Sequence, residues 1–299
     1  MVKTKRWGKK HEDKRNWKEY NEHLIRRGEY YLNPRFLEIW IDEIKELNHC
    51  KIGQPFMYPN SMIEFLAILK AKSFDYRSLQ GILRVLSRKL GNFPVISYSQ
   101  IRRRIKQLKF IFKPKNDHLI TGSDGSGMKV SNRGEWIRQK WKVRRGWVKV
   151  VIVGDTKGNI VDIRVGNEDL DENKAHRGML RANARNIDKN LGDGLYDRRL
   201  NFDLYRKLKI SPGLKIRSNA STKARGCQSR KKEVIKYKEQ GYEQWAQNID
   251  YGMRWPCTEG IFSAVKTIFG EVLNAHKKRN LYHEAKMKFW AYQTIRDIC

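Results

Sequence analysis

The chain has 299 residues and a formal net charge of +31 at pH 7. This length is enough for two domains, and the hydrophobic (39%) and aromatic (11%) content excludes a disordered chain. Such a positive charge favours a polyanion as partner. The part up to Lys115 and the part after it are both basic, so we expect the partner to run along the whole molecule.

A membrane surface is the competing polyanion. No apolar run approaches the ~18 residues that a spanning helix needs, and the N-terminal residues are polar and charged rather than those of a signal peptide. The four cysteines (Cys50, Cys227, Cys257 and Cys299) are scattered and form no C-x-x-C pair, which argues against zinc and against a disulfide framework. The sequence therefore predicts a cytoplasmic protein with reduced thiols and no membrane partner.

A succession of helices is expected over the first 115 residues. A basic arm, which either touches DNA or is simply solvated, precedes a candidate helix at Trp17–Arg27. Asn33-Pro34 is expected to open a second helix, since proline suits the first turn. Ser61 and Glu64 have the spacing of a capping box that opens a helix to about residue 72. Asp75 and Gly91 predict the start and the end of the next helix.

A further capping box at Ser97–Gln100 predicts a helix with Ile101 and Ile105 on its packed face. The opposite face is basic and carries no acid, with Arg102, Arg103, Arg104, Lys106 and Lys109. Three short helices of which the last is densely basic predict an all-α, helix-turn-helix-like DNA-binding domain. The alternative is a solvated basic helix on a helical bundle; the one-sided charge favours DNA binding.

After Lys113 the pattern changes from helical to extended. Trp147–Val153 is a strong candidate for a buried strand, and Asp155–Asn159 predicts a hairpin turn to the next strand. We expect strands at about 118–124, 147–153, 160–165, 187–191 and 213–217, and helices at about 173–185, 199–208 and from Pro256. Strands interleaved with helices in this order predict an α/β domain with a mixed sheet.

Three acidic residues stand out in this half: Asp124 and Asp193 at expected strand ends, and Glu259 on an expected helix. Taken singly, each is typical of a cap or turn residue. As a set they suit phosphodiester cleavage with two magnesium ions, which prefer hard oxygen ligands. Converging carboxylates without a cation would repel one another. Asp197 is the nearest rival to Asp193.

The stretch from Tyr251 to Lys266 is predicted to begin a helix, with Ile261, Phe262 and Val265 on an apolar face. Glu259 and Lys266 are seven residues apart and so share one face of that helix, while Arg254 precedes it. Taken alone, a carboxylate between an arginine and a lysine is typical of a surface salt-bridge cluster.

The chain resembles the DDE transposases of bacterial and archaeal insertion sequences, in particular the compact group called insertion-sequence family five. The resemblance extends from about Trp17 to Thr294. It is carried by Ser123–Gly127, Gly192–Asp197, Asn219–Gly226 and the series Tyr251, Arg254, Glu259, Lys266. This series is similar to the family's Tyr-Arg-Glu-Lys signature, but four residues rather than the usual three separate Arg254 from Glu259.

The resemblance implies an RNase H-like catalytic domain at 116–299, preceded by an end-recognition domain at 1–115. It implies that Asp124, Asp193 and Glu259 bind two Mg²⁺ or Mn²⁺ ions. Arg254 and Lys266 would then contact phosphates of the transposon end, with support from Tyr251. The expected activity is cleavage of the transposon ends and transfer of the 3′-hydroxyl to target DNA. The partners would be double-stranded DNA and a second copy of the chain, in a prokaryotic, nucleoid-associated setting.

A basic insertion is expected at about 218–250. The segment from Lys215 to Lys238 carries one acid, Glu233, among many basic side chains, including Arg217, Lys223, Arg225, Arg230, Lys231 and Lys232. It predicts a DNA grip, with a solvated charge run as the alternative. For Trp245 and Trp255 we favour core packing over stacking on a flipped base.

Three other functions are weighed against the transposase. A tyrosine-nucleophile recombinase is suggested by His276–Arg279, but Tyr282 and Tyr292 follow too closely to be its nucleophile. A structure-selective DNA nuclease of the RNase H-like fold would not need so large a helical half. A catalytically inactive, transposase-derived DNA-binding protein would not need all three acids.

Overall fold

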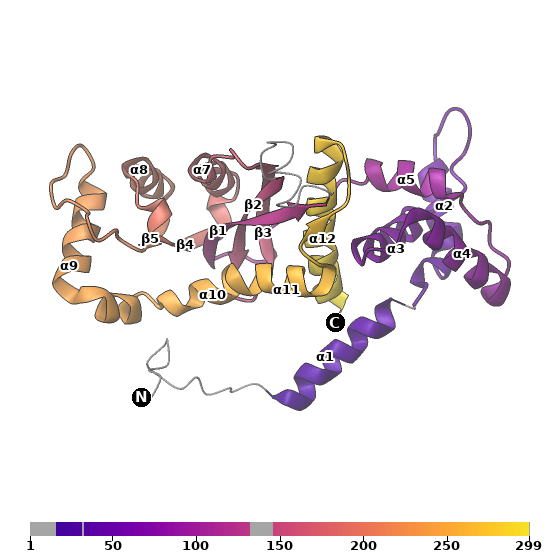
Figure 1. Ribbon diagram of the computed structural model, residues 1–299, viewed down its shortest axis with the longest axis horizontal. Helices are drawn as coiled ribbons and strands as arrows, with labels where there is room; N and C mark the ends of the chain where they lie inside the picture. The colour runs from indigo at the N-terminus through magenta and orange to yellow at the C-terminus, as the bar shows by residue number, and fades with distance from the viewer. Residues whose placement is uncertain (1–15, 32, 132–145, 299) are drawn as a thin grey trace, which may run out of the picture.

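The computed structural model describes residues 16–31, 33–131 and 146–298. Helices come first along the chain and lie at one end of an elongated molecule, beside an α/β unit (Figure 1). The N-terminal elements are α1 (Trp17–Tyr30), the 3-10 turn η1 (Arg35–Leu37), α2 (Trp40–Asn48), α3 (Asn60–Ala71), α4 (Tyr76–Leu90) and α5 (Tyr98–Gln107). The predicted order of a helical part before an α/β part is therefore confirmed.

Local side-chain chemistry fixes the ends of α4 and α5. The Asp75 carboxylate accepts hydrogen bonds from the amides of Arg77 and Ser78 at 2.8 and 3.0 Å. Gly91 ends α4 with a φ of 120°, which a residue with a Cβ rarely adopts. The Ser97 hydroxyl accepts the amide of Gln100 at the start of α5. These three predicted signals are confirmed.

The helix predicted from Ser61 is present as α3, but its predicted capping box is wrong, and so is the helix start predicted at Asn33-Pro34. The amide of Asn60 donates to the Glu43 carboxylate of α2 at 2.6 Å and that of Ser61 at 3.1 Å, so α3 is capped by another helix rather than by a local Ser61 box. Pro34 precedes only the short turn η1, and α2 begins at Trp40. For α3, a contact from another helix therefore takes the place of the local cap.

The α/β unit is built on a mixed sheet in the order β3-β2-β1-β4-β5, with β6 paired to the far end of β1. Its strands are β1 (Leu119–Val130), β2 (Trp147–Asp155), β3 (Ile160–Asn167), β4 (Ile187–Gly192), β5 (Ser211–Leu214) and β6 (Val272–Leu273). β1 runs antiparallel to β2 and parallel to β4. Gly158, at a φ of 79°, makes the predicted turn between β2 and β3.

β1 is longer than predicted, because it continues past Asp124 instead of ending there. Gly125 and Gly127 permit this extension. A Cβ on Gly125 would lie 2.5 Å from the Glu172 carboxylate, and one on Gly127 would lie 2.7 Å from the Trp147 ring. Asp124 is therefore held in the middle of a paired strand.

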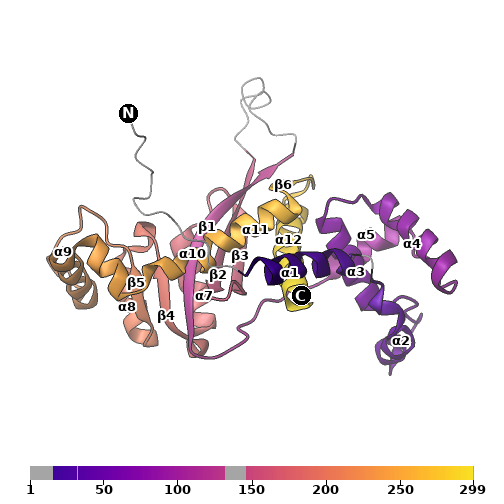
Figure 2. The ribbon, with the colours of Figure 1, turned by 90° about the horizontal axis from the view of Figure 1, so that it is seen from below.

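Helices cover both faces of the sheet (Figures 1 and 2). One face packs against α7 (Glu172–Ala182) and α8 (Arg199–Leu208), the other against α10 (Arg254–Cys257) and α11 (Glu259–Phe269). Alternate residues of β2 serve the two layers, with Ile152 facing α11 and Val153 facing α7. The remaining turns and helices are η2 (Ala184–Asn186), η3 (Gly194–Tyr196), α9 (Gln228–Asn248) and η4 (Tyr251–Met253). This arrangement confirms the RNase H-like fold.

The last helix, α12 (Lys278–Ile298), was not predicted, and it joins the two parts of the molecule. It packs against α3, α11 and the β2–β3 edge of the sheet. One continuous hydrophobic cluster includes Leu66 of α3, Ile152 of β2 and Phe289 of α12. The Lys288 side chain is 2% exposed, and its Nζ donates to the carbonyls of Phe269, Gly270 and Val272 at 2.8–2.9 Å, which fixes the end of α11.

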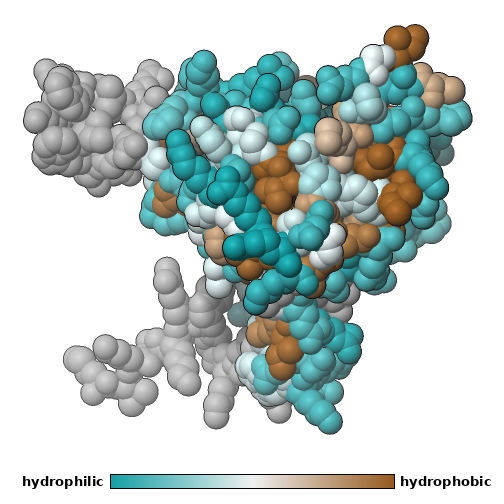
Figure 3. All heavy atoms as spheres, turned by 90° about the vertical axis from the view of Figure 1, so that its right-hand side faces the viewer, coloured by the Kyte–Doolittle hydropathy of each residue, from teal (hydrophilic) through white to brown (hydrophobic). Residues whose placement is uncertain are grey.

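The end of the molecule formed by the N-terminal helices is mainly hydrophilic, with hydrophobic residues in separate places (Figure 3). Ile41 of α2 and Ile52 in the following loop are the most exposed of these, at 67% and 98%. Across the described residues, no helix combines the length and the apolar character that crossing a membrane requires.

Candidate active site

Asp124 and Asp193 lie side by side because β1 and β4 are parallel neighbours. Ser123 is registered opposite Gly192, and each aspartate follows directly. The Asp193 carboxylate accepts the amide of Leu195 at 2.8 Å, which holds it at the start of η3. The structure thus brings together two acids that are 69 positions apart in the chain.

Glu259, the first residue of α11, is joined to Asp124 through Arg254. The Arg254 guanidinium donates to Oδ2 of Asp124 at 3.2 Å and also to Oε1 of Glu259. The side chains of Arg254 and Asp124 are 17% and 21% exposed, whereas that of Glu259 is 47% exposed. The third acid therefore lies at the open side of the cluster.

A pair of glycines lets α10 approach the sheet closely enough for this contact. Gly122 of β1 and Gly154 of β2 are registered partners. A Cβ on Gly122 would lie 2.7 Å from the Cβ of Cys257, and one on Gly154 would collide with the Cys257 carbonyl oxygen. Helix α10 carries Arg254 and leads into Glu259.

Tyr251 and Lys266 complete the predicted series around the same strands. The Tyr251 hydroxyl donates to the carbonyl of Gly192, the residue before Asp193, at 3.2 Å. Its ring lies 5.7 Å from the Arg254 guanidinium, in cation–π geometry. The Lys266 ammonium donates at 2.9 Å to Ser126, two residues beyond Asp124. All four members of the series thus surround the two strand aspartates.

The electrostatics of Asp124 are those of a carboxylate in need of a cation. Burial raises its pKa to about 6; the Gly125 amide and Arg254 oppose this shift, while the charges of Asp193 and Glu259 add to it. Carboxylate oxygens are the donors that Mg²⁺ and Mn²⁺ prefer. Within the described ranges, no three acidic, histidine or cysteine side chains are grouped closely enough to hold one ion as they stand. The donor set fits a divalent cation, with Arg254 supplying the balancing charge between Asp124 and Glu259 in this arrangement.

Asp197, the rival to Asp193, is engaged elsewhere. Its buried carboxylate accepts two hydrogen bonds from the Arg230 guanidinium, at 2.6 and 2.9 Å, and one from the Arg217 amide at 3.1 Å. Both of its oxygens therefore serve to fix the segment after β5 and the start of α9.

A buried polar network that the sequence did not reveal lies behind the aspartates, on the opposite face of the sheet. Asn190 of β4 donates to Thr121 and Ser123 of β1 at 2.8 and 3.1 Å, and accepts from the Tyr205 hydroxyl at 2.6 Å. Nε2 of His176 contacts the same hydroxyl at 3.2 Å. The network holds β1 and β4 in register. Alternating small polar residues in two strands were the only signal for it.

The predicted DNA-binding residues of α5 divide into two groups. Arg104 is half-buried; it donates to the carbonyl of Tyr58 and, at 2.9 Å, to the side chain of Asn60, so it ties α5 to the start of α3. Arg102, Arg103 and Lys106 are exposed on α5.

The basic segment after β5 is divided in the same way. Arg230 is paired with Asp197, and the Arg217 guanidinium donates to the carbonyls of Gly194 and Leu195, which braces η3 beside Asp193. The side chains of Lys223, Arg225 and Lys232 are exposed, and that of Lys231 is half-buried.

The two tryptophans differ. Trp245 is 1% exposed and packs against Tyr251 in a small cluster, as predicted. Trp255 is 59% exposed, so its predicted place in the core is wrong. It follows Arg254 on α10, and a Cβ on Gly260 of α11 would lie 3.2 Å from its ring.

Comparisons with solved structures return matches at low sequence identity. They include the simian T-cell lymphotropic virus intasome in complex with PP2A regulatory subunit B56 gamma (13% identity, 72% of both chains, TM-score 0.26). Two others are the Mos1 mariner paired end complex with Mn (10%, 94% of this chain and 98% of the other, 0.25) and a pre-cleavage Mos1 transpososome (9%, 83% and 81%, 0.23). With TM-scores this low, the assignment rests on family models instead.

One family model, described as a transposase DDE domain, matches residues 115–293, and a second with the same description matches residues 25–133. The first match covers more than half of the chain and contains Asp124, Asp193 and Glu259. The chain therefore belongs to the DDE transposase domain family, which implies phosphoryl-transfer catalysis in DNA transposition.

Proposed function

We propose that this protein is the transposase of an insertion sequence of family five, which binds the terminal inverted repeats, cleaves them and transfers the freed 3′-hydroxyl to target DNA. The observation that carries the proposal is the juxtaposition of Asp124 and Asp193 on parallel strands, with Arg254 connecting Asp124 to Glu259. Family membership supplies the reaction class.

Asp124, Asp193 and Glu259 are assigned as ligands of two Mg²⁺ or Mn²⁺ ions. When bound, such ions lower the pKa of water and stabilise the attacking and leaving oxygens of an in-line displacement. The half-buried Asp124 would hold an ion at the closed side of the site, and the exposed Glu259 would hold one at the side that DNA reaches.

Arg254 and Lys266 are assigned to the phosphates of the DNA end. Arg254 has a planar fork of donors that suits a phosphate, and Lys266 supplies a single charge near Ser126. Tyr251 positions both the guanidinium, through its ring, and the Asp193 segment, through its hydroxyl.

Recognition of the ends is assigned to residues 1–115, with Arg102, Arg103 and Lys106 of α5 facing DNA and Arg104 holding α5 in place. The exposed side chains of Lys223, Arg225 and Lys232, in the segment after β5, are assigned to the DNA backbone. This segment lies on the side of the active site away from α5 (Figure 1). The partner is double-stranded DNA, and a homodimer pairs the two ends. The exposed Trp255 is available to stack on an unpaired base near Arg254.

The test is nicking of a duplex that carries the inverted repeats flanking the coding sequence. Asp124→Asn, Asp193→Asn and Glu259→Gln should each reduce nicking by more than roughly a hundredfold while leaving DNA binding largely intact. Asp188→Asn, which removes an exposed carboxylate of β4, the strand that leads into Asp193, is the matched control. A wild-type protein that binds the repeats without nicking them contradicts the proposal and favours a DNA-binding protein.

A further inference from the structure

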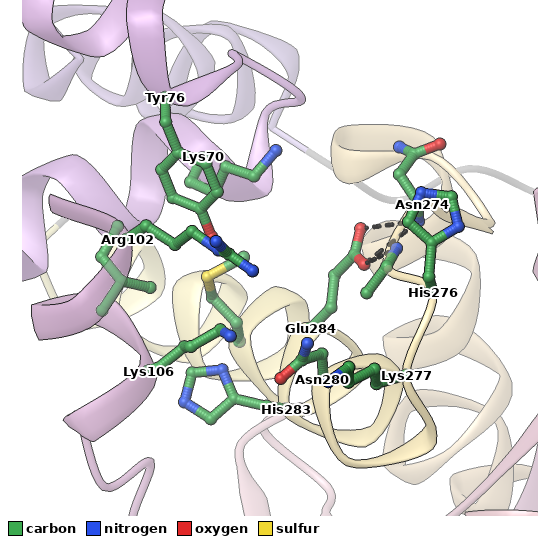
Figure 4. Close-up of a pocket in the computed structure, with 13 residues that line it drawn as sticks. Lys70, Tyr76, Arg102, Lys106, Asn274, His276, Lys277, Asn280, His283 and Glu284 are labelled. Atoms are coloured by element: carbon green, nitrogen blue, oxygen red, sulfur yellow. Dashed lines mark hydrogen bonds between the residues drawn. The ribbon is translucent and has the colours of Figure 1, made fainter. Parts of the chain in front are cut away.

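A basic pocket lies outside the candidate active site, between the N-terminal helices and the start of α12. It has a volume of about 320 Å³ (Figure 4). Lys70, Arg102 and Lys106 enter it from the N-terminal helices, while His276, Lys277 and Asn280 enter it from the loop after β6 and from α12. We call it the α5–α12 pocket.

The positive charges of this pocket are not balanced by the protein. Among the described residues, no carboxylate forms an ion pair with Lys70, Arg102, Lys106 or Lys277. The one acid in its wall, Glu284, is occupied, because its carboxylate accepts the amides of Asn274 and Ala275 at 2.9–3.1 Å.

The cations are close enough to repel one another. The pKa of Lys106 is lowered, first by desolvation and then by the charges of Arg102, Lys277 and Arg279. Repulsion within a close group of like charges is relieved by a bound anion. Donors of three kinds (ammonium, guanidinium and amide) converge here, which suits the several oxygens of a phosphate.

The pocket is connected to the active site by one strand. β6 pairs with β1 at Lys129 and Val130, and the pocket residues Asn274 to Lys277 follow β6. From Asp124 to Val130, β1 covers roughly 20 Å at about 3.3 Å per residue. A DNA duplex rises ~3.4 Å along its axis per base pair, so this length corresponds to about six base pairs.

We propose that the α5–α12 pocket binds a backbone phosphate of a DNA duplex that runs from the catalytic carboxylates toward α5, at a distance on the order of six base pairs from the cleaved phosphate. The inference rests on the proposed function, because it assumes that the duplex in the active site is the one that α5 contacts. The pocket sets the path of the DNA between the two parts of the chain and carries no sequence preference.

The first experiment measures the salt dependence of binding of the full chain to a repeat-bearing duplex, without divalent metal. Lys277→Gln and, independently, Lys70→Gln should each weaken binding to repeat and scrambled duplexes alike, and lower the slope of log K against log salt by about one. Lys207→Gln removes an exposed lysine of α8 and should keep the wild-type slope. Circular dichroism verifies that the variants fold. A wild-type slope in both pocket variants overturns the proposal.

The second experiment replaces single phosphates of the repeat by neutral methylphosphonates. At one or two positions, on the order of six base pairs from the cleavage site, the replacement should weaken wild-type binding by roughly tenfold. The same replacement should cost Lys277→Gln little, because the partner charge is already gone. Equal losses in the wild type and in Lys277→Gln overturn the proposal.

The two claims fail separately. A wild-type protein that nicks the repeat but has no sensitive phosphate at this distance overturns the pocket and keeps the transposase. If binding depends on one phosphate at this distance, Lys277→Gln removes that dependence and the protein never nicks, the pocket proposal stands and the proposed function is overturned.

Discussion

The guanidinium of Arg254 donates a hydrogen bond to Asp124 at 3.2 Å while its other terminal nitrogen donates to Glu259. One side chain thus links the strand and the helix that supply two of the three acids. A planar fork can reach both carboxylates at once, whereas an ammonium group is a single point charge.

Replacing Arg254 by lysine should therefore separate geometry from charge. We expect Arg254→Lys to reduce nicking by roughly tenfold or more, since one forked contact of about 1.4 kcal/mol is lost, with a smaller change in DNA affinity. Single-turnover nicking and a binding titration on the same duplex measure the two effects. Equal nicking by Arg254→Lys and the wild type would show that the fork is dispensable.

The two neighbouring aspartates should differ in what they stabilise. Asp197→Asn breaks a buried pair with Arg230, whose side chains are 0% and 17% exposed, and should lower the free energy of unfolding by about 3 kcal/mol. Asp193→Asn should leave the free energy of unfolding close to that of the wild type while abolishing nicking. Urea unfolding and nicking of both variants test this pair; a destabilised Asp193→Asn protein with a stable Asp197→Asn protein would reverse the two roles.

Gly154 is expected to be needed for both stability and catalysis. A Cβ at this position collides with the Cys257 carbonyl, so Gly154→Ala should cost about 1–3 kcal/mol and move α10, with Arg254, away from Asp124. The control is Gly178→Ala on α7, where a Cβ meets nothing within 4 Å and alanine favours the helix. The midpoint temperature of unfolding and the rate of nicking should both fall for Gly154→Ala, and neither should fall for Gly178→Ala.

His176 should make the fold sensitive to acid. Burial, and to a lesser extent the charge of Arg177, lowers its pKa to about 3. The unfolded chain, with a histidine pKa near 6.5, therefore binds one more proton between about pH 6.5 and pH 3, so stability is fully present above pH 6.5 and falls as the pH drops through this window.

The corresponding measurement is the free energy of unfolding at several pH values. His176→Gln should remove up to about 1.4 kcal/mol per pH unit of the acid slope. His49→Gln, which removes an exposed histidine, should keep that slope. An unchanged slope in His176→Gln would mean that another group governs the acid sensitivity.

Periodicity and capping residues predicted most of the elements, because those signals are local. The helix at Arg199–Leu208 and the ends set by Asp75, Gly91 and Ser97 depend on hydrogen bonds between residues a few positions apart. The start of α3 was predicted to within one residue, but its cap was not, because Glu43 lies on another helix. The end of β1 was mispredicted because Gly125 and Gly127, which normally indicate a turn, here make room for Glu172 and Trp147.

The site was predictable as a set of residues but not as an arrangement. The spacing of Tyr251, Arg254, Glu259 and Lys266 singled them out, yet the contact of Arg254 with Asp124 requires the strand register and the Gly122–Gly154 pair. Pairing of Asp197 with Arg230 was likewise invisible, since the partner is 33 residues away in a segment expected to grip DNA. Helix α12 was not predicted. The burial of its Lys288 depends on carbonyls 16 to 19 residues away, which no local pattern indicates.

The most direct test of the central claim is strand transfer. Among the hydrogen bonds of the described residues, no serine, tyrosine or histidine side chain is bonded to Asp124 or Glu259. The nearby hydroxyl of Tyr251 donates to the carbonyl of Gly192. The protein is incubated with a pre-nicked repeat end, a supercoiled target and Mg²⁺, and then denatured with detergent. We predict joined DNA that is free of protein, formed by direct attack of the 3′-hydroxyl. A protein–DNA adduct that disappears on protease treatment would contradict this and indicate a covalent protein nucleophile.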